Sequence, residues 1–301
     1  MMKKLALAAT ALLAAGTAFA DQPTFTYSTY PAGQVDNAGA PTWDKSPMKN
    51  WPARNLDIPD TSMATAGGSV AGGPLRFEVG LAFEHESYDA DGSTGQHHYN
   101  TFLPGLKFGL AKPFQGGSEL SGDVTVFAGR TSYSGAVTGA PGHDVSVDGL
   151  DHTALETNVQ YKLPTGFFGT SVMLGLGYQM RDDQGVQTHG TYFRREQRFF
   201  ATLGVERPFH IAEAWTVTPR LAYHQVILGR LEQDIPGGGT VHEHGFGGEL
   251  AVDIDYRTGN RDLVLTPYVR QWNLGASSVT GTAFEPKSRT REVGMTLSVR
   301  F

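Results

Sequence analysis

The chain has 301 residues and carries 24 basic against 30 acidic side chains, which gives a net charge of −6 with histidine neutral. This acidic balance argues against a nucleic-acid partner, because nucleic acid needs a basic surface. The chain contains no cysteine, so a disulfide framework and a thiolate metal site are both excluded.

The first twenty residues have the pattern of a secretory signal peptide. Two lysines precede an apolar run from Leu5 to Ala15, and small residues follow up to Ala20. A basic start, a short apolar core and a small-residue exit occur together in cleaved export signals. We therefore predict that residues 1–20 are a signal peptide, cleaved before Asp21. Its loss removes two lysines and no acid, leaving 22 basic against 30 acidic residues and a net charge of −8.

Residues 21–73 are rich in proline, glycine, alanine, asparagine and threonine, with Trp43 and Trp51 as the main large apolar side chains. Such a composition cannot bury enough apolar area to fold alone. We expect an irregular N-terminal segment. It is either a periplasmic tail or a plug, and the tryptophans offer a contact for a periplasmic partner.

From Pro74 to Phe301, apolar and polar residues alternate with a period of two. This pattern predicts β-strands with one apolar and one polar face. The first strand has Leu75, Phe77, Val79, Leu81 and Phe83 on its apolar face. The other predicted strands lie within residues 106–110, 120–128, 155–163, 168–178, 199–205, 215–223, 246–256, 263–269 and 293–301.

No stretch of residues 21–301 has the ~18 to 20 consecutive apolar residues that a transmembrane helix requires. If the chain enters a membrane, it must do so as a closed barrel, since only helices and closed barrels pair every backbone group in lipid. The alternative is a soluble sandwich, which also has one apolar and one polar face on each strand.

The lengths of the links between the predicted strands favour the barrel. Short links are expected at 112–117, 164–166, 208–213 and 258–261, and long links at 86–99, 132–149, 182–192, 230–244 and 275–288. Strict alternation puts all short turns at one end, as in barrels with periplasmic turns and extracellular loops. We predict an all-β fold: residues 74–301 form a transmembrane antiparallel up-and-down β-barrel of about ten strands, with eight to twelve possible.

The last predicted strand, Val293 to Phe301, resembles the C-terminal signature of Gram-negative outer-membrane β-barrel proteins, with alternate apolar residues and a terminal Phe301. The resemblance implies location in the cell outer membrane, surrounded by outer-membrane lipid and lipopolysaccharide. It also implies that the barrel insertion machinery reads Phe301 as an insertion signal. The signature covers one strand and identifies no subfamily.

Aromatic residues are expected to form girdles at the two membrane interfaces. Trp215 and Phe301 fall near the predicted short-turn end, and Tyr99 and Trp272 near the long-loop end.

If the apolar faces meet lipid, the polar faces point into the lumen and carry charges of both signs. Such a lumen either neutralises and occludes itself or forms a narrow aqueous passage that selects solutes. We therefore predict either a narrow channel or a structural and interaction protein. The expected lumen-facing charges are Arg76, Glu78, Glu84, Lys107, Asp123, Glu156, Lys162, Arg194, Glu196, Arg198, Glu206, Arg220, Glu249, Asp253, Asp255, Arg270, Glu292 and Arg300.

A surface-facing hydrolase is the alternative function. Asp89 and Asp91 resemble the paired aspartates of the omptin proteases, which are also ten-stranded barrels. That family also needs an Asp, any residue, His unit on a facing loop. Here the corresponding loop has His242 and His244, and its aspartate has the wrong spacing, so half of the site is missing.

His85 and Ser87 offer a second hydrolase hypothesis. They lie two residues apart, hence on one face of a strand, and resemble the base and nucleophile of barrel lipid A deacylases. Nucleophile activation also needs a third group that orients the base, and none is recognisable. We therefore predict no catalytic site. Histidines and carboxylates gather near the long links without recognisable ligand spacing, so we predict no metal site and no cofactor.

Overall fold

The computed structural model of the chain describes residues 73–92, 95–137, 140–184, 193–234, 239–278 and 285–301. The predicted signal peptide and all but the last residue of the predicted N-terminal segment 21–73 lie outside these ranges, so both stay predictions. No helix in the described part of the chain has the length and apolar character needed to cross a membrane.

The described residues form antiparallel strands joined in chain order, with one short 3₁₀ turn. The long strands are β1 (Arg76–Gly92), β2 (Gly95–Pro113), β3 (Glu119–Val137), β4 (Ala140–Pro164), β5 (Ser171–Gln184), β6 (Phe193–Glu206), β8 (Trp215–Gln233), β10 (Gly245–Thr258), β11 (Arg261–Leu274) and β12 (Ser288–Arg300). Two four-residue strands, β7 (Phe209–Ala212) and β9 (Thr240–Glu243), pair only with β8, and η1 spans Gln115–Gly117.

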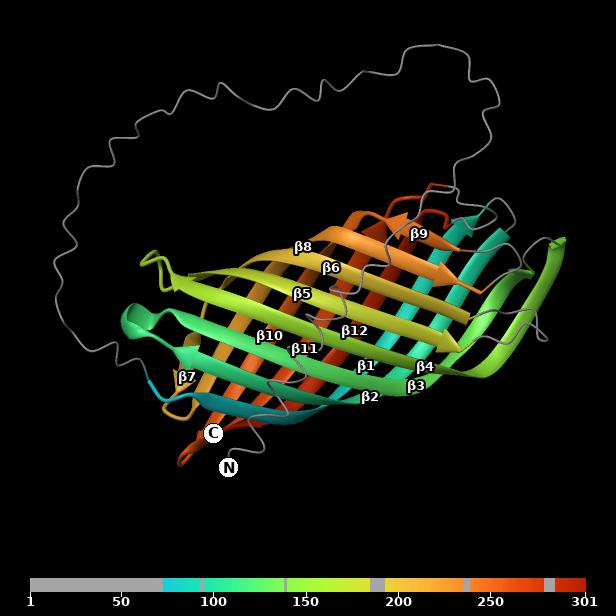
Figure 1. Ribbon diagram of the computed structural model, residues 1–301. Helices are drawn as coiled ribbons and strands as arrows, with labels where there is room; N and C mark the ends of the chain where they lie inside the picture. Colours follow the sequence, from blue (N-terminus) through green and yellow to red (C-terminus); the bar gives the residue numbers. More distant parts are fainter. Residues whose placement is uncertain (1–72, 93–94, 138–139, 185–192, 235–238, 279–284) are drawn as a thin grey trace, which may run out of the picture. The chain divides into compact units, whose positions relative to one another are not determined.

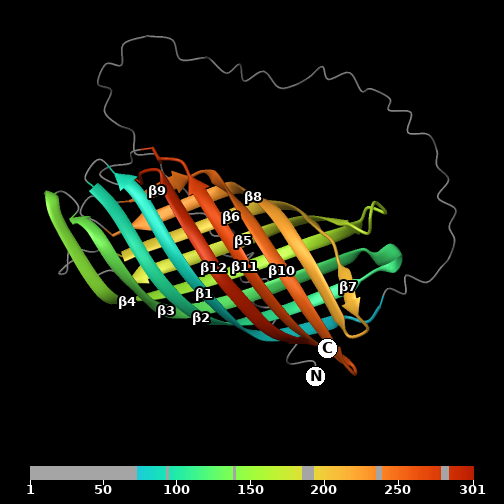
Figure 2. The same ribbon diagram turned by 180° about the vertical axis from the view of Figure 1, so that it is seen from behind.

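The ten long strands close into a barrel (Figures 1 and 2). Each pairs with its neighbours in sequence, and β1 pairs with β12 to complete the ring. At this closure the backbone N–H of Phe77 donates to Phe301 at 2.8 Å, and that of Phe301 donates to Phe77 at 2.9 Å. The predicted ten-stranded antiparallel barrel is therefore confirmed.

The two faces of the barrel wall have opposite chemistry. Every long strand exposes large apolar side chains on the outside, such as Leu106 on β2 and Leu250 on β10, which are 50% and 56% exposed. We call this outer apolar surface the belt. The inner face carries buried charged side chains, among them Glu84 and Glu292, which are 1% and 0% exposed. A soluble sandwich would bury its apolar faces, so this distribution matches a barrel surrounded by lipid.

Two predicted long links are wrong, because the strands continue through them. β1 and β2 pair up to Gly92 and Gly95, and β3 and β4 pair up to Val137 and Ala140. The ladder extends past the belt into water, where neither face has to be apolar. The period-two signal therefore disappears although the backbone stays paired.

The turn between β4 and β5 is longer than predicted. Its ends are joined by Thr165 and Thr170, whose backbone groups hydrogen-bond at 3.0 Å and whose hydroxyl groups lie 2.8 Å apart. Phe168 has a positive φ of 48° inside this turn and is exposed. The sequence pattern predicted that Phe168 begins the strand. In the structure its apolar side chain belongs to the turn, and β5 begins at Ser171.

Candidate functional site

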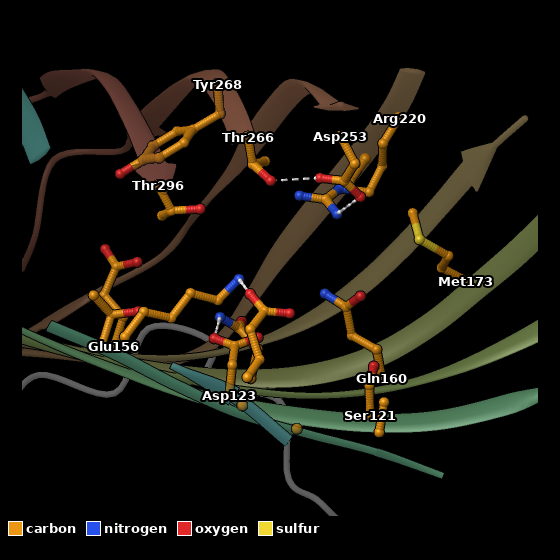
Figure 3. Close-up of a pocket in the computed structure, with 18 of the residues that line it drawn as sticks. Ser121, Asp123, Glu156, Gln160, Met173, Arg220, Asp253, Thr266, Tyr268 and Thr296 are labelled. Atoms are coloured by element: carbon orange, nitrogen blue, oxygen red, sulfur yellow. Dashed lines mark hydrogen bonds and ion pairs between the residues drawn. The ribbon is translucent and has the colours of Figure 1, made fainter. Parts of the chain in front are cut away.

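A polar cavity of about 180 Å³ occupies the lumen toward the end of the barrel that carries the short turns. Figure 3 shows Asp123 and Glu156 on one side and Arg220 and Asp253 on the other. Most of the predicted lumen charges line this cavity. Among the others, Glu84, Arg198 and Glu292 are buried inside the barrel beyond it.

The charges of the cavity wall pair with one another across neighbouring strands. Glu78 accepts from Lys107 at 2.8 Å and from Arg300 at 3.0 Å, and Lys162 lies 2.6 Å from Glu206. Arg220 lies between Glu249 at 3.2 Å and Asp253 at 3.5 Å. The wall is therefore self-neutralising and presents no strip of one sign that would attract ions of the other.

Solvent reaches this cavity from the short-turn end. The side chains of Arg76 and Lys162, near the ends of β1 and β4, are 34% and 31% exposed. Exposure falls along the lumen until the side chains of Glu84 and Glu292 are 0% exposed.

A layer of five charged side chains crosses the lumen beyond the cavity, and we call it the central layer. Its members are Glu84 on β1, Glu156 on β4, Arg181 on β5, Arg270 on β11 and Glu292 on β12. Arg181 Nη2 donates to Glu292 Oε1 at 2.7 Å and to Glu84 Oε1 at 2.9 Å. Arg270 Nη1 donates to Glu292 Oε2 at 2.9 Å and to Glu156 Oε1 at 3.2 Å.

Neutral side chains complete the hydrogen bonding of the central layer. Gln179 Nε2 donates to Glu156 at 2.6 Å, the Tyr268 hydroxyl donates to Glu84 at 2.7 Å, and Trp272 Nε1 donates to Glu292 at 3.0 Å. Trp272 is fully buried here. Its predicted place in an interfacial girdle is wrong, because it is an even number of residues from Arg270 and so shares its inward face.

The lumen is also filled beyond the central layer, toward the long-loop end. Glu285, in the link between β11 and β12, reaches inward and accepts from Arg194 Nη2 at 3.1 Å and from Gln233 Nε2 at 3.1 Å. The Arg194 guanidinium lies 4.4 Å from the centre of the Tyr88 ring, whose hydroxyl also donates to Glu285. Among the described residues, the inward side chains at this end of the barrel are therefore packed against one another and hydrogen-bonded.

Arg181 and Glu285 were missed by the sequence analysis. Arg181 could have been found, because the alternation of β5 continues past Tyr178 and places residues 179, 181 and 183 inward. Glu285 carried no signal, since it lies in a link with no periodicity.

The structure does not bring the candidate hydrolase residues together. His85, Ser87 and Asp89 point outward from β1, and Asp89 bonds His98 Nδ1 at 2.7 Å. His85 and Ser87 share no hydrogen bond. His242 points outward from β9, which pairs with β8, and His244 points outward next to the start of β10, so both lie at least three strands from β1. The side chain of Asp91 lies outside the described residues.

The three glutamates of the central layer place one oxygen each within 4.8 Å of one another, a spacing that fits a metal ion. Arg181 and Arg270 already bind all three carboxylates. The two guanidinium groups supply the positive charge that a cation would bring, so this arrangement is an ion-pair layer.

No family model matches the chain, and no curated protein matches it in sequence. The fold is similar to that of the outer membrane protease OmpT from Escherichia coli, with a TM-score of 0.50 and 10% identity over 77% of this chain and 97% of that one. Neisserial surface protein A also matches, with a TM-score of 0.31 and 15% identity over 74% and 95% of the two chains. So does the β domain of the Bordetella autotransporter BrkA, with a TM-score of 0.38 and 12% identity over 74% and 99%.

At this level of identity, the similarity to OmpT concerns the fold alone. The chain thus has the fold of Gram-negative outer-membrane β-barrel proteins. The exposed belt supplies the lipid-facing surface that this membrane location requires.

Proposed function

We propose that this outer-membrane barrel is a structural and interaction protein whose lumen does not conduct. The observation that carries the proposal is the central layer, in which three carboxylates and two guanidinium groups from five strands pair at hydrogen-bonding distance. An aqueous pore would leave such side chains hydrated. Here the carboxylates of Glu84 and Glu292 are enclosed on every side.

The element proposed to contact partners is the hairpin of β3 and β4. β4 has 25 residues, whereas its neighbour β5 has 14 and begins to pair with it only at His152. The preceding part of β4 pairs with β3 alone, and both views show this hairpin projecting at the long-loop end (Figures 1 and 2). Ion pairs across the lumen join the strands of the barrel wall to one another. A wall fixed in this way would hold the projecting hairpin in one orientation above the membrane.

The test of the closed lumen is conductance in planar lipid bilayers. The wild-type protein is expected to give no discrete steps. The double variant Arg181→Ala, Glu292→Ala removes one charge of each sign from the central layer and is expected to conduct. The matched control is Asp182→Ala, Arg195→Ala, because this pair joins β5 and β6 on the outer face with two hydrogen bonds of 2.8 Å.

A narrow gated channel is the second candidate, favoured by the cavity that reaches the central layer from the short-turn end. It predicts reversible voltage-dependent openings of the wild-type protein. Steps of equal size in the wild-type protein and the double variant would overturn the closed-lumen proposal. Folding of each variant is verified by its heat-dependent gel mobility and by a β-type circular dichroism spectrum. A variant that gives no conductance because it is unfolded is thereby distinguished from a folded barrel with a closed lumen.

A further inference from the structure

Three cations follow one another on the outward face where the chain enters β12, one just before the strand and two within it. Lys287, Arg289 and Arg291 are all exposed, and the inward residues between them, Ser288 and Thr290, are buried. We call Lys287, Arg289 and Arg291 the cationic stripe. Alternate residues of a strand stand roughly 6.6–6.8 Å apart, so the three charges span roughly 13 Å.

The cationic stripe lacks the acidic partners that other outward cations at this end of the barrel have. Arg130 lies 3.9 Å from Asp151, Arg195 lies 2.8 Å from Asp182, and Arg230 lies 2.6 Å from Glu232.

For the stripe, no ion pair is formed within the described ranges. Arg291 Nε donates to the neutral Gln271 at 3.3 Å. Asp89 stands opposite Arg289 in the strand register, but its carboxylate bonds His98. The stripe is therefore a local excess of positive charge on an acidic protein.

The stripe begins where the belt ends. Val293, the next outward residue of β12, is 53% exposed, and Val269 stands opposite it on β11 and is also exposed. Beside the cations lie neutral hydrogen-bonding side chains, Gln271 and Asn273 on β11 and Ser87 on β1. On this part of the outer surface, the cationic stripe therefore lies on the long-loop side of the belt. Neutral polar side chains flank the stripe, and the apolar belt adjoins it.

We propose that the cationic stripe binds the phosphate groups of an outer-leaflet lipid, a phosphorylated glycolipid whose acyl chains lie on the belt beneath. The arginine guanidinium binds phosphate oxygens through two parallel hydrogen bonds, and lysine adds a point charge. The span of the stripe accommodates more than one phosphate on the same headgroup. Because the site lies on the outer face, it is independent of whether the lumen conducts.

The experiment measures binding of bis-phosphorylated lipid A to the purified protein in dodecyl maltoside micelles by native mass spectrometry. The triple variant Lys287→Gln, Arg289→Gln, Arg291→Gln is expected to bind at least tenfold more weakly than the wild-type protein, because it removes three charge-assisted contacts to phosphate. The matched control is Arg130→Gln, Arg195→Gln, Arg230→Gln. It also removes three outward cations, and its binding is expected to stay within about twofold of wild type.

Three outcomes overturn the proposal. One is equal loss of binding in the stripe and control variants, which would mean that net charge alone attracts the lipid. Another is undiminished binding of dephosphorylated lipid A by the wild-type protein. The third is binding of inorganic phosphate alone with the same dependence on the stripe, which would assign a free-anion site. If the triple variant does not fold, Arg289→Gln and Arg291→Gln are measured singly, each with an expected loss of about threefold, and no loss in either overturns the proposal.

Discussion

At the scale of single residues, the buried charges of the lumen depend on one another. Arg181 and Arg270 each contact more than one carboxylate, and Glu292 contacts both arginines. A buried ion pair adds little stability relative to apolar packing, but the loss of one partner leaves an uncompensated charge away from water.

Glu292→Ala is therefore expected to lower the free energy of unfolding by about 3–5 kcal/mol. The measurement is reversible urea unfolding in lipid vesicles. Glu232→Ala serves as the control, because its partner Arg230 is half exposed and such surface pairs contribute less than about 1 kcal/mol. A loss for Glu292→Ala as small as that of the control would show that water hydrates the central layer.

A prediction about pH concerns His97. This residue lies outside the belt, on the part of β2 that precedes Phe102 in the sequence. Burial lowers the pKa of His97 below its ordinary value of 6.5 and outweighs the Glu285 carboxylate, which raises it, while Arg194 lowers it further. Its Nδ1 lies 2.8 Å from the Tyr133 hydroxyl. The unfolded chain binds a proton more readily than the folded one, so the stability that His97 contributes is complete above pH 6.5 and decreases as the pH falls below it.

NMR titration of the imidazole, with His97→Gln for assignment, measures this pKa. A midpoint at or above 6.5 would mean that the ring is freely hydrated.

The direction of most lumen side chains could be predicted from the sequence, because period-two alternation assigns each residue to a face. Arg76, Lys107 and Asp253 are inward for that reason. The contacts could not be predicted. Glu84 and Arg181 are 97 positions apart and meet only because the barrel closes. The alternating pattern does not indicate which charged residues lie at the same height along the barrel axis.

At the scale of elements, the strands are defined by two different environments. Within the belt, lipid outside and polar lumen inside impose alternation, and here the predicted strands agree with the ten long strands apart from their ends. Beyond the belt, β1 to β4 stay paired, and their outward residues are polar. That is why the sequence indicated loops where the backbone remains paired.

The last strand carries the prediction about assembly. We propose that Phe301 is the insertion signal; it is 53% exposed, and its ring stacks on Phe77 with centroids 6.3 Å apart. Phe301→Ala is expected to slow assembly several-fold in vesicles that contain purified barrel insertion machinery, while spontaneous folding into short-chain lipid proceeds at nearly the wild-type rate.

Phe209→Ala is the matched control, since Phe209 is another exposed aromatic near the short-turn end. Equal slowing in both kinds of vesicle would indicate a packing role at the β1 and β12 closure. Equal rates for Phe301→Ala and the control would remove the signal role.

At the scale of the whole molecule, a lipid-facing belt and a charged, self-neutralising lumen are two consequences of one alternating pattern. The sequence predicted the closed barrel, because alternation and link lengths are local properties. It left open whether the lumen conducts, since that depends on how inward side chains from β1, β4, β5, β11 and β12 meet. The hydrolase residues show the converse, because Asp89 and His242 were paired by analogy and lie on separate parts of the outer face.

The central claim is that apolar faces meet lipid and charged faces meet inside the barrel. The chain has no cysteine, so single substitutions such as Glu292→Cys and Val293→Cys allow a spin label to be placed at each position of β12 in turn. In lipid vesicles, labels at 293, 295 and 297 are predicted to collide with oxygen dissolved in the bilayer, and labels at 292, 296 and 298 to be protected from it. Protection of the first set, in a protein that stays soluble without detergent, would contradict the account.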